Sequence, residues 1–403
     1  MLTRLLLGFG ALVALTALAA CDGFTDEIDP PIDRIESDPL NAPDQIPFVT
    51  AGVRQRFNTA HDQLTVLVSG LSDEYIFDRA VSDATFPTFE EIDQGLILLD
   101  NNSVDNQYDL LNEFRFLADD LLRRVSEDVD FTGVDEDQTA EFAENKRDAE
   151  YTGFLYGGIA RYMLATYYGL TQREGGAPID GSSLIPAAEL YAQAIERLTT
   201  ALTFAGGDYE TRLVNSLIAR AHLYNGDLGA ARAAAANGLV QGDDPFTSNH
   251  APTSTNFQWA QAGIGRTQYS VAQAYVDLAD PRVAVEEIPI AAGFFRQALY
   301  TENSSPITFM SWQENNLILA EAALDAGDAA GALTLVNENR TAAGLDGLAS
   351  LDLAGLIVER QKELFTEGAR LVDQRRFNQW HLGPDTWQYL PVTQSERNAN
   401  PNI

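Results

Sequence analysis

The only cysteine of the chain is the side chain whose position most directly implies chemistry. Arg4 is followed by an apolar stretch from Leu5 to Ala17. The small residues Ala19 and Ala20 then come directly before Cys21. This order is typical of a signal peptide, and a cysteine at the cleavage point is the residue that receives lipid. The apolar run is shorter than the roughly 20 residues of a membrane span. We therefore expect cleavage before Cys21 and a membrane anchor of diacylglycerol plus a fatty acid such as palmitate; the alternative is an ordinary signal peptide with a chance cysteine.

The histidines form no recognisable catalytic or metal-binding pattern. They are far apart in the sequence and none belongs to an HExxH arrangement: His61, His222, His250 and His381. The chain also lacks a phosphate-binding glycine loop and a GxSxG elbow. Its 59 Asp and Glu residues are too numerous for sequence alone to select a glycosidase pair. We expect no catalysis, no cofactor and no metal centre.

One acidic segment partly matches a calcium loop. Asp128 and Asp130, followed by Thr132 and Gly133, are similar to the start of an EF-hand, but the twelfth position is Thr139 in place of the bidentate Glu. The segment Asp128–Thr139 is therefore either a calcium site or an acidic turn between helices, and the turn is the commoner explanation for such a partial match.

Aromatic residues beside amides offer a different chemistry. Trp259 and Tyr269 lie in a loop-rich stretch with Phe257, and Tyr75 lies in another such stretch with Phe86 and Phe89. Aromatic faces stack on the C–H faces of sugars while amides bond the hydroxyls. We take Trp259, Tyr269 and Tyr75 as candidate ligand contacts; the alternative is that these rings hold long loops against the core.

The charge of the chain excludes some partners. The formal net charge is −33, and it becomes −34 when Arg4 is removed with the signal peptide. Lysine is nearly absent, since only Lys146 and Lys362 occur. Nucleic acids and anionic lipid surfaces require basic patches, so we expect neither as a partner. A saline habitat, in which salt screens self-repulsion, is one hypothesis for the acidity.

Helices must position the candidate residues. Asp22–Pro47 is rich in proline and acids and reads as a linker. Apolar residues then recur at spacings of three and four, which predicts helices; these cover about 49–67, 108–125, 140–170 and 185–202. Between the first two helices, 72–106 reads as loop-rich. Short strands are expected only at 287–290 and 388–390.

Two later segments repeat a helix–turn–helix pattern. An alanine-rich helix ends at Gly226-Asp227, and another ends at Gly327-Asp328, each followed by a further alanine-containing helix. Glycine ends the first helix of each pair and Asp caps the second. This is the unit of tetratricopeptide-like repeats. The sequence predicts an all-α fold, an irregular tetratricopeptide-like helical scaffold with a loop-rich face that binds ligand.

The C-terminal third resembles the SusD/RagB family of outer-membrane nutrient-binding lipoproteins. The matching blocks are WQENNLILAEA at Trp312–Ala322, VNENRTAAGL at Val336–Leu345, ERQKELFTEGARLVDQRR at Glu359–Arg376 and LPVTQSERNANPN at Leu390–Asn402. Looser matches are Asp73-Glu74, Arg161-Tyr162 to Tyr168-Gly169 and Asp280-Pro281-Arg282. The charged residues of the third block fall on helical spacings at which carboxylates and guanidiniums can pair. We therefore expect them to stabilise the fold and not to take part in catalysis.

The resemblance implies a non-catalytic protein of the outer membrane. It would be lipid-anchored and surface-exposed, bind an oligosaccharide or another nutrient, and act as a lid on a TonB-dependent, SusC-like transporter. Its parts would be a signal peptide at 1–20, the lipidated cysteine and linker at 21–48, and a SusD-like helical domain at 49–403. Two alternatives are a periplasm-facing tetratricopeptide-like interaction scaffold and a lipid-anchored glycoside hydrolase.

Overall fold

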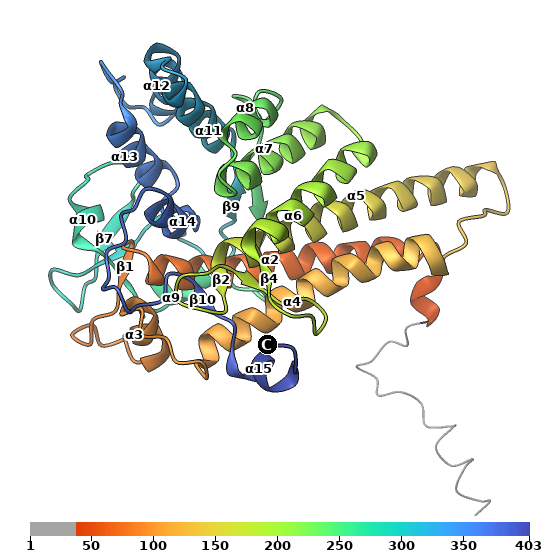
Figure 1. The fold of residues 1–403 in the computed structure, drawn as a ribbon, viewed down its shortest axis with the longest axis horizontal. Helices are drawn as coiled ribbons and strands as arrows, with labels where there is room; N and C mark the ends of the chain where they lie inside the picture. Colours follow the sequence, from red (N-terminus) through yellow and green to blue (C-terminus); the bar gives the residue numbers. More distant parts are fainter. Residues whose placement is uncertain (1–37) are drawn as a thin grey trace, which may run out of the picture.

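The computed structural model describes residues 38–403, so Cys21 and the predicted signal peptide lie outside the described residues. Helices dominate the described part, and Figure 1 shows that the strands are short and scattered between them. No helix within 38–403 is long and apolar enough to cross a membrane.

The longer helices are α2 (Ile46–Leu71), α4 (Asn102–Arg123), α5 (Glu136–Tyr167), α6 (Ala187–Ala201), α7 (Asp208–Tyr224), α11 (Trp312–Asp325), α12 (Ala329–Ala342) and α13 (Leu353–Glu363). The shorter ones are α3 (Pro87–Asp93), α8 (Leu228–Ala235), α9 (Phe257–Ala262), α10 (Gln273–Val276), α14 (Ala369–Arg376) and α15 (Gln394–Ala399). Single turns of other helix types are η1 (Asp38–Asn41), η2 (Arg124–Asp128) and η3 (Leu202–Phe204).

The strands form two-stranded pairs that join distant parts of the chain. The antiparallel pairs are β1 (Tyr75–Ile76) with β6 (Ser270–Val271), β3 (Gly176–Ala177) with β4 (Ile185–Pro186), β5 (Phe246–Ser248) with β9 (Ile307–Met310), and β7 (Val285–Glu287) with β8 (Phe295–Gln297). One parallel pair joins β2 (Tyr168–Gly169) to β10 (Leu390–Pro391).

The core lies between three long helices, α2, α4 and α5, which run side by side in Figure 1 and contact one another. Phe57 of α2 is its centre, with ring centroids 5.8 Å from Phe114 of α4 and 5.2 Å from Tyr156 of α5. The same ring meets Phe246 of β5 and Phe309 of β9 at 5.4 and 5.3 Å. A buried aromatic cluster of this size contributes both burial and ring–ring attraction, so it fixes how the helices and the β5–β9 pair meet.

The two predicted helix pairs are confirmed as α7–α8 and α11–α12. Gly226 and Gly327 have φ angles of 85° and 81°, a conformation that residues with a Cβ disfavour. Asp227 accepts a hydrogen bond from Ala230 N, and Asp328 accepts one from Gly331 N, so each aspartate caps the second helix of its pair. The all-α, tetratricopeptide-like scaffold predicted from the sequence is therefore the fold observed.

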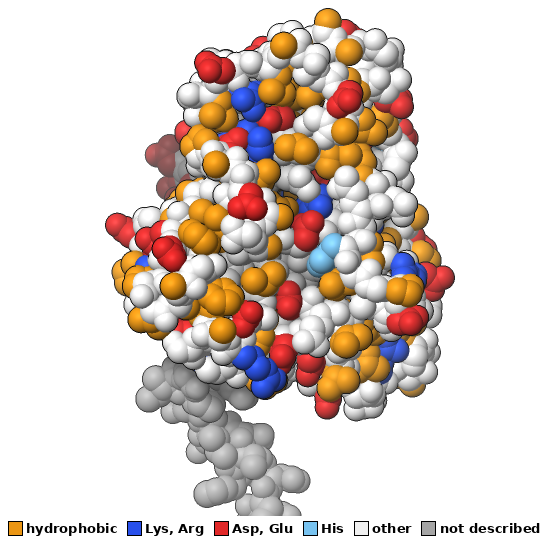
Figure 2. All heavy atoms as spheres, turned by 90° about the vertical axis from the view of Figure 1, so that its left-hand side faces the viewer, with side chains coloured by type: hydrophobic (Ala, Val, Ile, Leu, Met, Phe, Trp, Pro, Cys, Tyr) orange, Lys and Arg blue, Asp and Glu red, His pale blue; other side chains and the backbone are white. Residues whose placement is uncertain are grey.

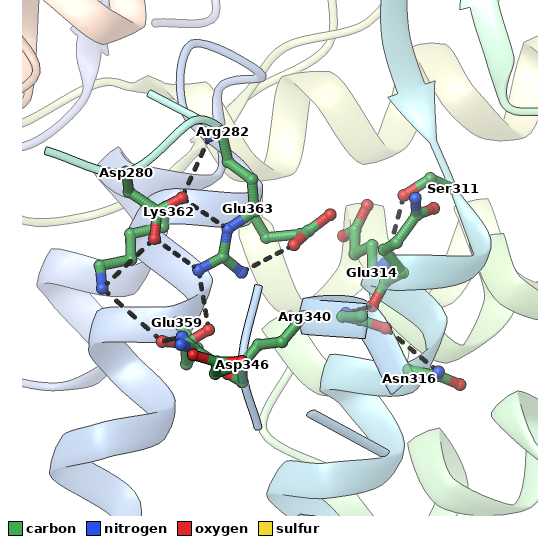
Figure 3. A network of polar contacts seen from close by, with 12 residues as sticks. Asp280, Arg282, Ser311, Glu314, Asn316, Arg340, Asp346, Glu359, Lys362 and Glu363 are labelled. Atoms are coloured by element: carbon green, nitrogen blue, oxygen red, sulfur yellow. Dashed lines mark hydrogen bonds and ion pairs between the residues drawn. The ribbon is translucent and has the colours of Figure 1, made fainter. Parts of the chain in front are cut away.

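Charged residues of the C-terminal blocks and of the Asp280–Arg282 segment form a partly buried network (Figure 3). Arg282 donates to Asp280, Glu359 and Glu363 at 2.9 Å each, and Arg340 donates to Glu359 at 2.8 Å. These groups come from α12, α13 and the loop before β7, so the network fastens the second helix pair to the rest of the molecule. The structural role predicted for these charged residues is therefore the one observed.

Pairing within a single helix, however, is not the main use of these residues. The helix predicted through the third block is interrupted after Glu363, and Gly368 with a φ of 84° separates α13 from α14. Arg360 instead reaches Asp373 across that break, and Arg370 donates two hydrogen bonds of 2.6 Å to Asp73, 297 residues away.

Three boundaries differ from the sequence-based expectation. Residues 38–48, at the end of the predicted linker, are η1 and the start of α2, because Ile46 is buried and Pro47 is tolerated in a first helical turn. The loop-rich stretch 72–106 contains α3 and the start of α4. The two expected strands are observed at 285–287 and 390–391.

Candidate functional site

A hollow of about 710 Å³ opens between α2, α3, α4 and α9, and it is the best candidate for a ligand site in the described part of the chain. Its lining combines aromatic and apolar side chains with amides, hydroxyls and two carboxylates: Gln63, Leu67, Phe86, Pro87, Thr88, Phe89, Asn102, Ser103, Asp105, Asn106, Asp109, Phe257 and Gln261. Hollows with apolar walls and a few polar groups are the usual form of small-ligand sites.

The wall made by α3 and α4 is fixed by one asparagine. Asn101 caps α4 by accepting hydrogen bonds from Ser103 N and Val104 N at 3.1 Å each. Its amide nitrogen donates to Thr88 O of α3 at 3.0 Å, and the hydroxyls of Thr88 and Ser103 lie 2.8 Å apart. Asn101 therefore holds the two helix N-termini together at the edge of the hollow.

The opposite wall is the short helix α9. Asn256 caps it by accepting from Trp259 N at 2.8 Å, and the Asp62 carboxylate accepts from Phe257 N at 3.1 Å. Asp62 belongs to α2, so this bond fastens the start of α9 to α2. Phe257 and Gln261, four residues apart on one face of α9, then line the hollow, and Gln261 Oε1 is buried there without a hydrogen-bond partner.

The predicted contacts Tyr75 and Tyr269 lie behind the wall of the hollow. Both rings are buried, with exposed fractions of 1% and 0%, and their hydroxyls donate to Gln258 Oε1 at 2.6 Å and Phe89 O at 3.0 Å. Because both rings are buried, a ligand in the hollow cannot touch them in this structure. Gly70 makes room for one of them, because a Cβ there would lie 2.4 Å from the Tyr269 ring.

These tyrosines nevertheless support the site through an aromatic stack. Tyr75 stacks on Tyr269 at 5.8 Å between centroids, Tyr269 stacks on Phe89 at 4.9 Å, and Phe89 meets Phe86 edge to face at 5.8 Å. Phe86 is 38% exposed and lines the hollow, with Arg266 over its ring at 4.4 Å. The stack gives the exposed ring a rigid base in the core.

Trp259, the third predicted contact, is partly exposed on α9 but does not line this hollow. A Cβ on Gly265 would lie 2.6 Å from the Trp259 ring, so the indole packs closely over that glycine. The residue is two positions from Phe257, which puts it on the other side of the helix. Its role as a ligand contact stays a prediction.

The polar members of the hollow were not predicted from the sequence. Gln63, Asn106 and Gln261 are amides, and Asn106 donates to Gln63 Oε1 at 3.0 Å. Asp105 accepts a hydrogen bond from the Ser395 hydroxyl. No local pattern marks these residues, since they come from three segments that only the fold brings together. The one available signal was that Phe257 lies between the amides Asn256 and Gln258.

A second polar cluster has the order of a serine hydrolase triad but no access to substrate. Ser248 Oγ lies 3.4 Å from His250 Nε2, and His250 Nδ1 lies 3.5 Å from Asp62 Oδ2. Ser248 is fully buried, and its hydroxyl also lies 2.9 Å from His61 Nδ1. A nucleophile must reach the substrate, so this cluster joins α2 to β5 and is not an active site.

The acidic segment Asp128–Thr139 uses its side chains internally. Asp128 pairs with Arg123 at 2.6 Å, Asp130 accepts from the Thr132 hydroxyl at 2.7 Å, and Asp135 caps α5. Within residues 38–403, no group of three or more His, Cys, Asp or Glu side chains is arranged to hold a metal ion. The geometry favours the interpretation as an acidic turn.

No model of a known protein family matches the sequence, and no curated protein matches it. The fold, in contrast, matches solved structures. A SusD superfamily protein from Bacteroides thetaiotaomicron superimposes with a TM-score of 0.71 at 15% identity, covering 90% of this chain and 99% of that one. A SusD-like carbohydrate-binding protein from Bacteroides vulgatus gives 0.68 at 16% identity, covering 90% and 97%. Surface glycan-binding protein A from Bacteroides uniformis gives 0.70 at 16% identity, covering 89% and 98%. The fold is that of the SusD superfamily, as the C-terminal blocks predicted.

Proposed function

We propose that this protein binds a nutrient glycan, without cleaving it, in the hollow between α2, α3, α4 and α9. The observation that carries the proposal is the lining itself. Phe86 and Phe257 offer aromatic faces to sugar C–H groups, and Gln63, Asn106 and Gln261 offer amides to hydroxyls. The same lining contains no His, Cys, Lys or Arg, and its only acidic side chains are Asp105 and Asp109. Because glycosidases use paired carboxylates, hydrolysis is the rival activity that the experiment must test.

The shared fold supports this proposal from a second direction. Proteins of the same fold are described as a surface glycan-binding protein and as laminarin-binding. Fold alone does not fix a ligand, and these chains are only 16% and 15% identical to this one. The ligand assignment therefore rests on the hollow, and the fold raises the expectation of a saccharide.

We further propose that the protein belongs to the SusD/RagB family and serves as a lid on a SusC-like, TonB-dependent transporter. The four C-terminal sequence blocks and the fold support membership. The lipidation motif at Cys21 supports attachment to the outer membrane. Digestion of intact cells with a protease tests the surface location, and complete protection of the protein would contradict it.

Replacing Phe257 by Ala is expected to weaken glycan binding at least tenfold. The substitution removes the partly buried Phe257 ring, one of the aromatic rings that line the hollow. A loss of about 1.4 kcal/mol of stacking corresponds to a factor of ten in affinity. The measurement is titration calorimetry with whichever neutral oligosaccharide of a glycan array binds the natural protein most tightly. Phe48→Ala is the matched control, because Phe48 is 60% exposed and lies outside the hollow.

The array also separates the rival functions. Unchanged affinity in Phe257→Ala, with circular dichroism showing that the variant folds, would place the ligand elsewhere. Release of reducing ends during incubation with the array glycans would identify a hydrolase. Binding to no glycan at all would contradict the proposal.

A further inference from the structure

The hollow carries negative charge without a matching cation in its lining. Asp105 and Asp109 both line it, and no lysine or arginine does. Arg266, which is not part of the lining, lies over the Phe86 ring at 4.4 Å and donates to the Thr85 hydroxyl at 2.6 Å. Figure 2 shows a face of the molecule on which acidic side chains are spread widely. The hollow therefore lies in a protein whose overall field also repels anions, with a formal net charge of −33.

The two aspartates differ in how far their charge is already compensated. Asp105 lies in the first turn of α4, where the helix dipole stabilises a negative charge, and it accepts a hydrogen bond from Ser395. Asp109 lies one turn further along, is exposed, and makes no hydrogen bond or ion pair with any other residue in 38–403. Asp109 is thus the carboxylate available to a ligand.

The surroundings of Asp109 are themselves negative. Partial burial, Asp105 and Glu396 of α15 together raise the pKa of the Asp109 carboxyl above its ordinary value. The negative charges of Asp105 and Glu396 disfavour a further negative charge at Asp109, and they would also repel an anionic group of a ligand placed there. A neutral hydroxyl, in contrast, can donate to the carboxylate in a charge-assisted hydrogen bond.

We infer that the hollow selects uncharged, hydroxyl-rich saccharides over saccharides that carry carboxylate or sulfate, and that Asp109 is the residue that sets this selection. The inference rests on the proposed glycan function and names the ligand class of the same site. Hydroxyl groups of a neutral sugar donate to Asp109, whereas an acidic group placed there meets the like charges of Asp105, Asp109 and Glu396.

The test compares one neutral oligosaccharide, the tightest binder on the array, with the same oligosaccharide oxidised at C6 to the uronate. Calorimetry at low salt is expected to give at least tenfold weaker binding for the uronate. The ratio between the two affinities should be smaller at 0.5 M salt, because salt screens charge repulsion at a partly open site. This gap in affinity should also narrow in Asp109→Asn, which removes the charge and keeps the shape of the side chain.

Asp325→Asn is the matched control. It removes the same charge at the exposed end of α11, outside the hollow, and should leave the gap unchanged. Equal affinity for the two sugars, or a gap that Asp109→Asn does not narrow, would overturn the inference while leaving glycan binding intact. Preference for the uronate would overturn it in the same way. Absence of binding to both sugars would overturn the proposed function as well.

Discussion

Replacing Asp373 by Asn is expected to lower the free energy of unfolding by about 3–5 kcal/mol. Asp373 is 4% exposed and accepts from Arg360 at 2.7 and 3.1 Å and from Arg376 at 2.9 Å. Arg360 is 1% exposed, and its Nη1 already has no hydrogen-bond partner. Without the aspartate charge, the Arg360 guanidinium stays ionised in the interior and loses both of its carboxylate hydrogen bonds, so only the more distant charge of Glu321 compensates it.

A double variant separates the loss of the ion pair from the loss of packing. Arg360→Met with Asp373→Leu replaces the buried charges by apolar side chains, and replacements of this kind are often neutral or stabilising. We expect it to recover most of the stability that Asp373→Asn loses, measured by urea unfolding of the two variants and the natural protein. Asp325→Asn, at an exposed site, should change stability by less than about 0.5 kcal/mol. A loss below 1 kcal/mol for Asp373→Asn would show that solvent reaches Arg360.

His61 should make the protein acid-sensitive. Burial, Arg220 and His250 lower the pKa of the His61 imidazole to about 3. The folded state therefore keeps this ring neutral while the unfolded state takes up a proton near pH 6.5, so stability is lost as the pH falls from about 6.5 towards 3. At pH 4.5 the pH lies about two units below the unfolded-state pKa of His61, which corresponds to a loss of roughly 3 kcal/mol in the free energy of unfolding.

The pH effect is measured against His61→Gln, which has no proton to take up. Between pH 7.5 and 4.5 the natural protein should lose about 2–3 kcal/mol more than this variant. His222→Gln is the control, because His222 is only half-buried and the lowering of its pKa is opposed by Asp227. Equal pH slopes for the natural protein and His61→Gln would contradict the prediction.

The comparison of variants is needed because Glu74 acts in the opposite direction. Burial is the main cause that raises the pKa of the Glu74 carboxyl to about 7, although it accepts from the Ser69 hydroxyl at 2.6 Å. An acid with a raised pKa in the folded state loses stability as the pH rises from about 4.5 to 7. The stability of the whole protein therefore reflects both groups, whereas the difference from His61→Gln isolates one.

The sequence was sufficient for the scaffold because the scaffold is built from local signals. Apolar spacings of three and four predicted α2, α4, α5 and α6, and the Gly–Asp turns predicted both helix pairs to within a few residues. The break after Glu363 was missed, because the charge pattern continues through it and only Gly368 hints at the interruption. Tertiary packing, not propensity, decides such a boundary.

The lining of the hollow could be predicted only in part. Among the aromatic residues that the sequence singled out, Phe86 and Phe257 line the hollow, and their contact with a ligand stays a prediction. Which rings are accessible depends on packing that sequence does not state: Tyr75 and Tyr269 are buried by strand pairing between β1 and β6, almost 200 positions apart. Asp109 carries no local signal, because only the fold places it in one hollow with residues of α9 and brings Glu396 of α15 near it.

The contacts around the hollow join residues that are far apart in the sequence, and this separation has a consequence for the order of folding. The α7–α8 and α11–α12 pairs close over turns of a few residues and need little loop closure. The hollow depends on distant closures, such as Asp62 with Phe257 and Tyr75 with Gln258, which are 195 and 183 residues apart. Long loops cost entropy before their contacts repay it, and they slow the search. Helical pairs should therefore form early on the folding pathway, and the binding hollow should be among the last parts to take shape.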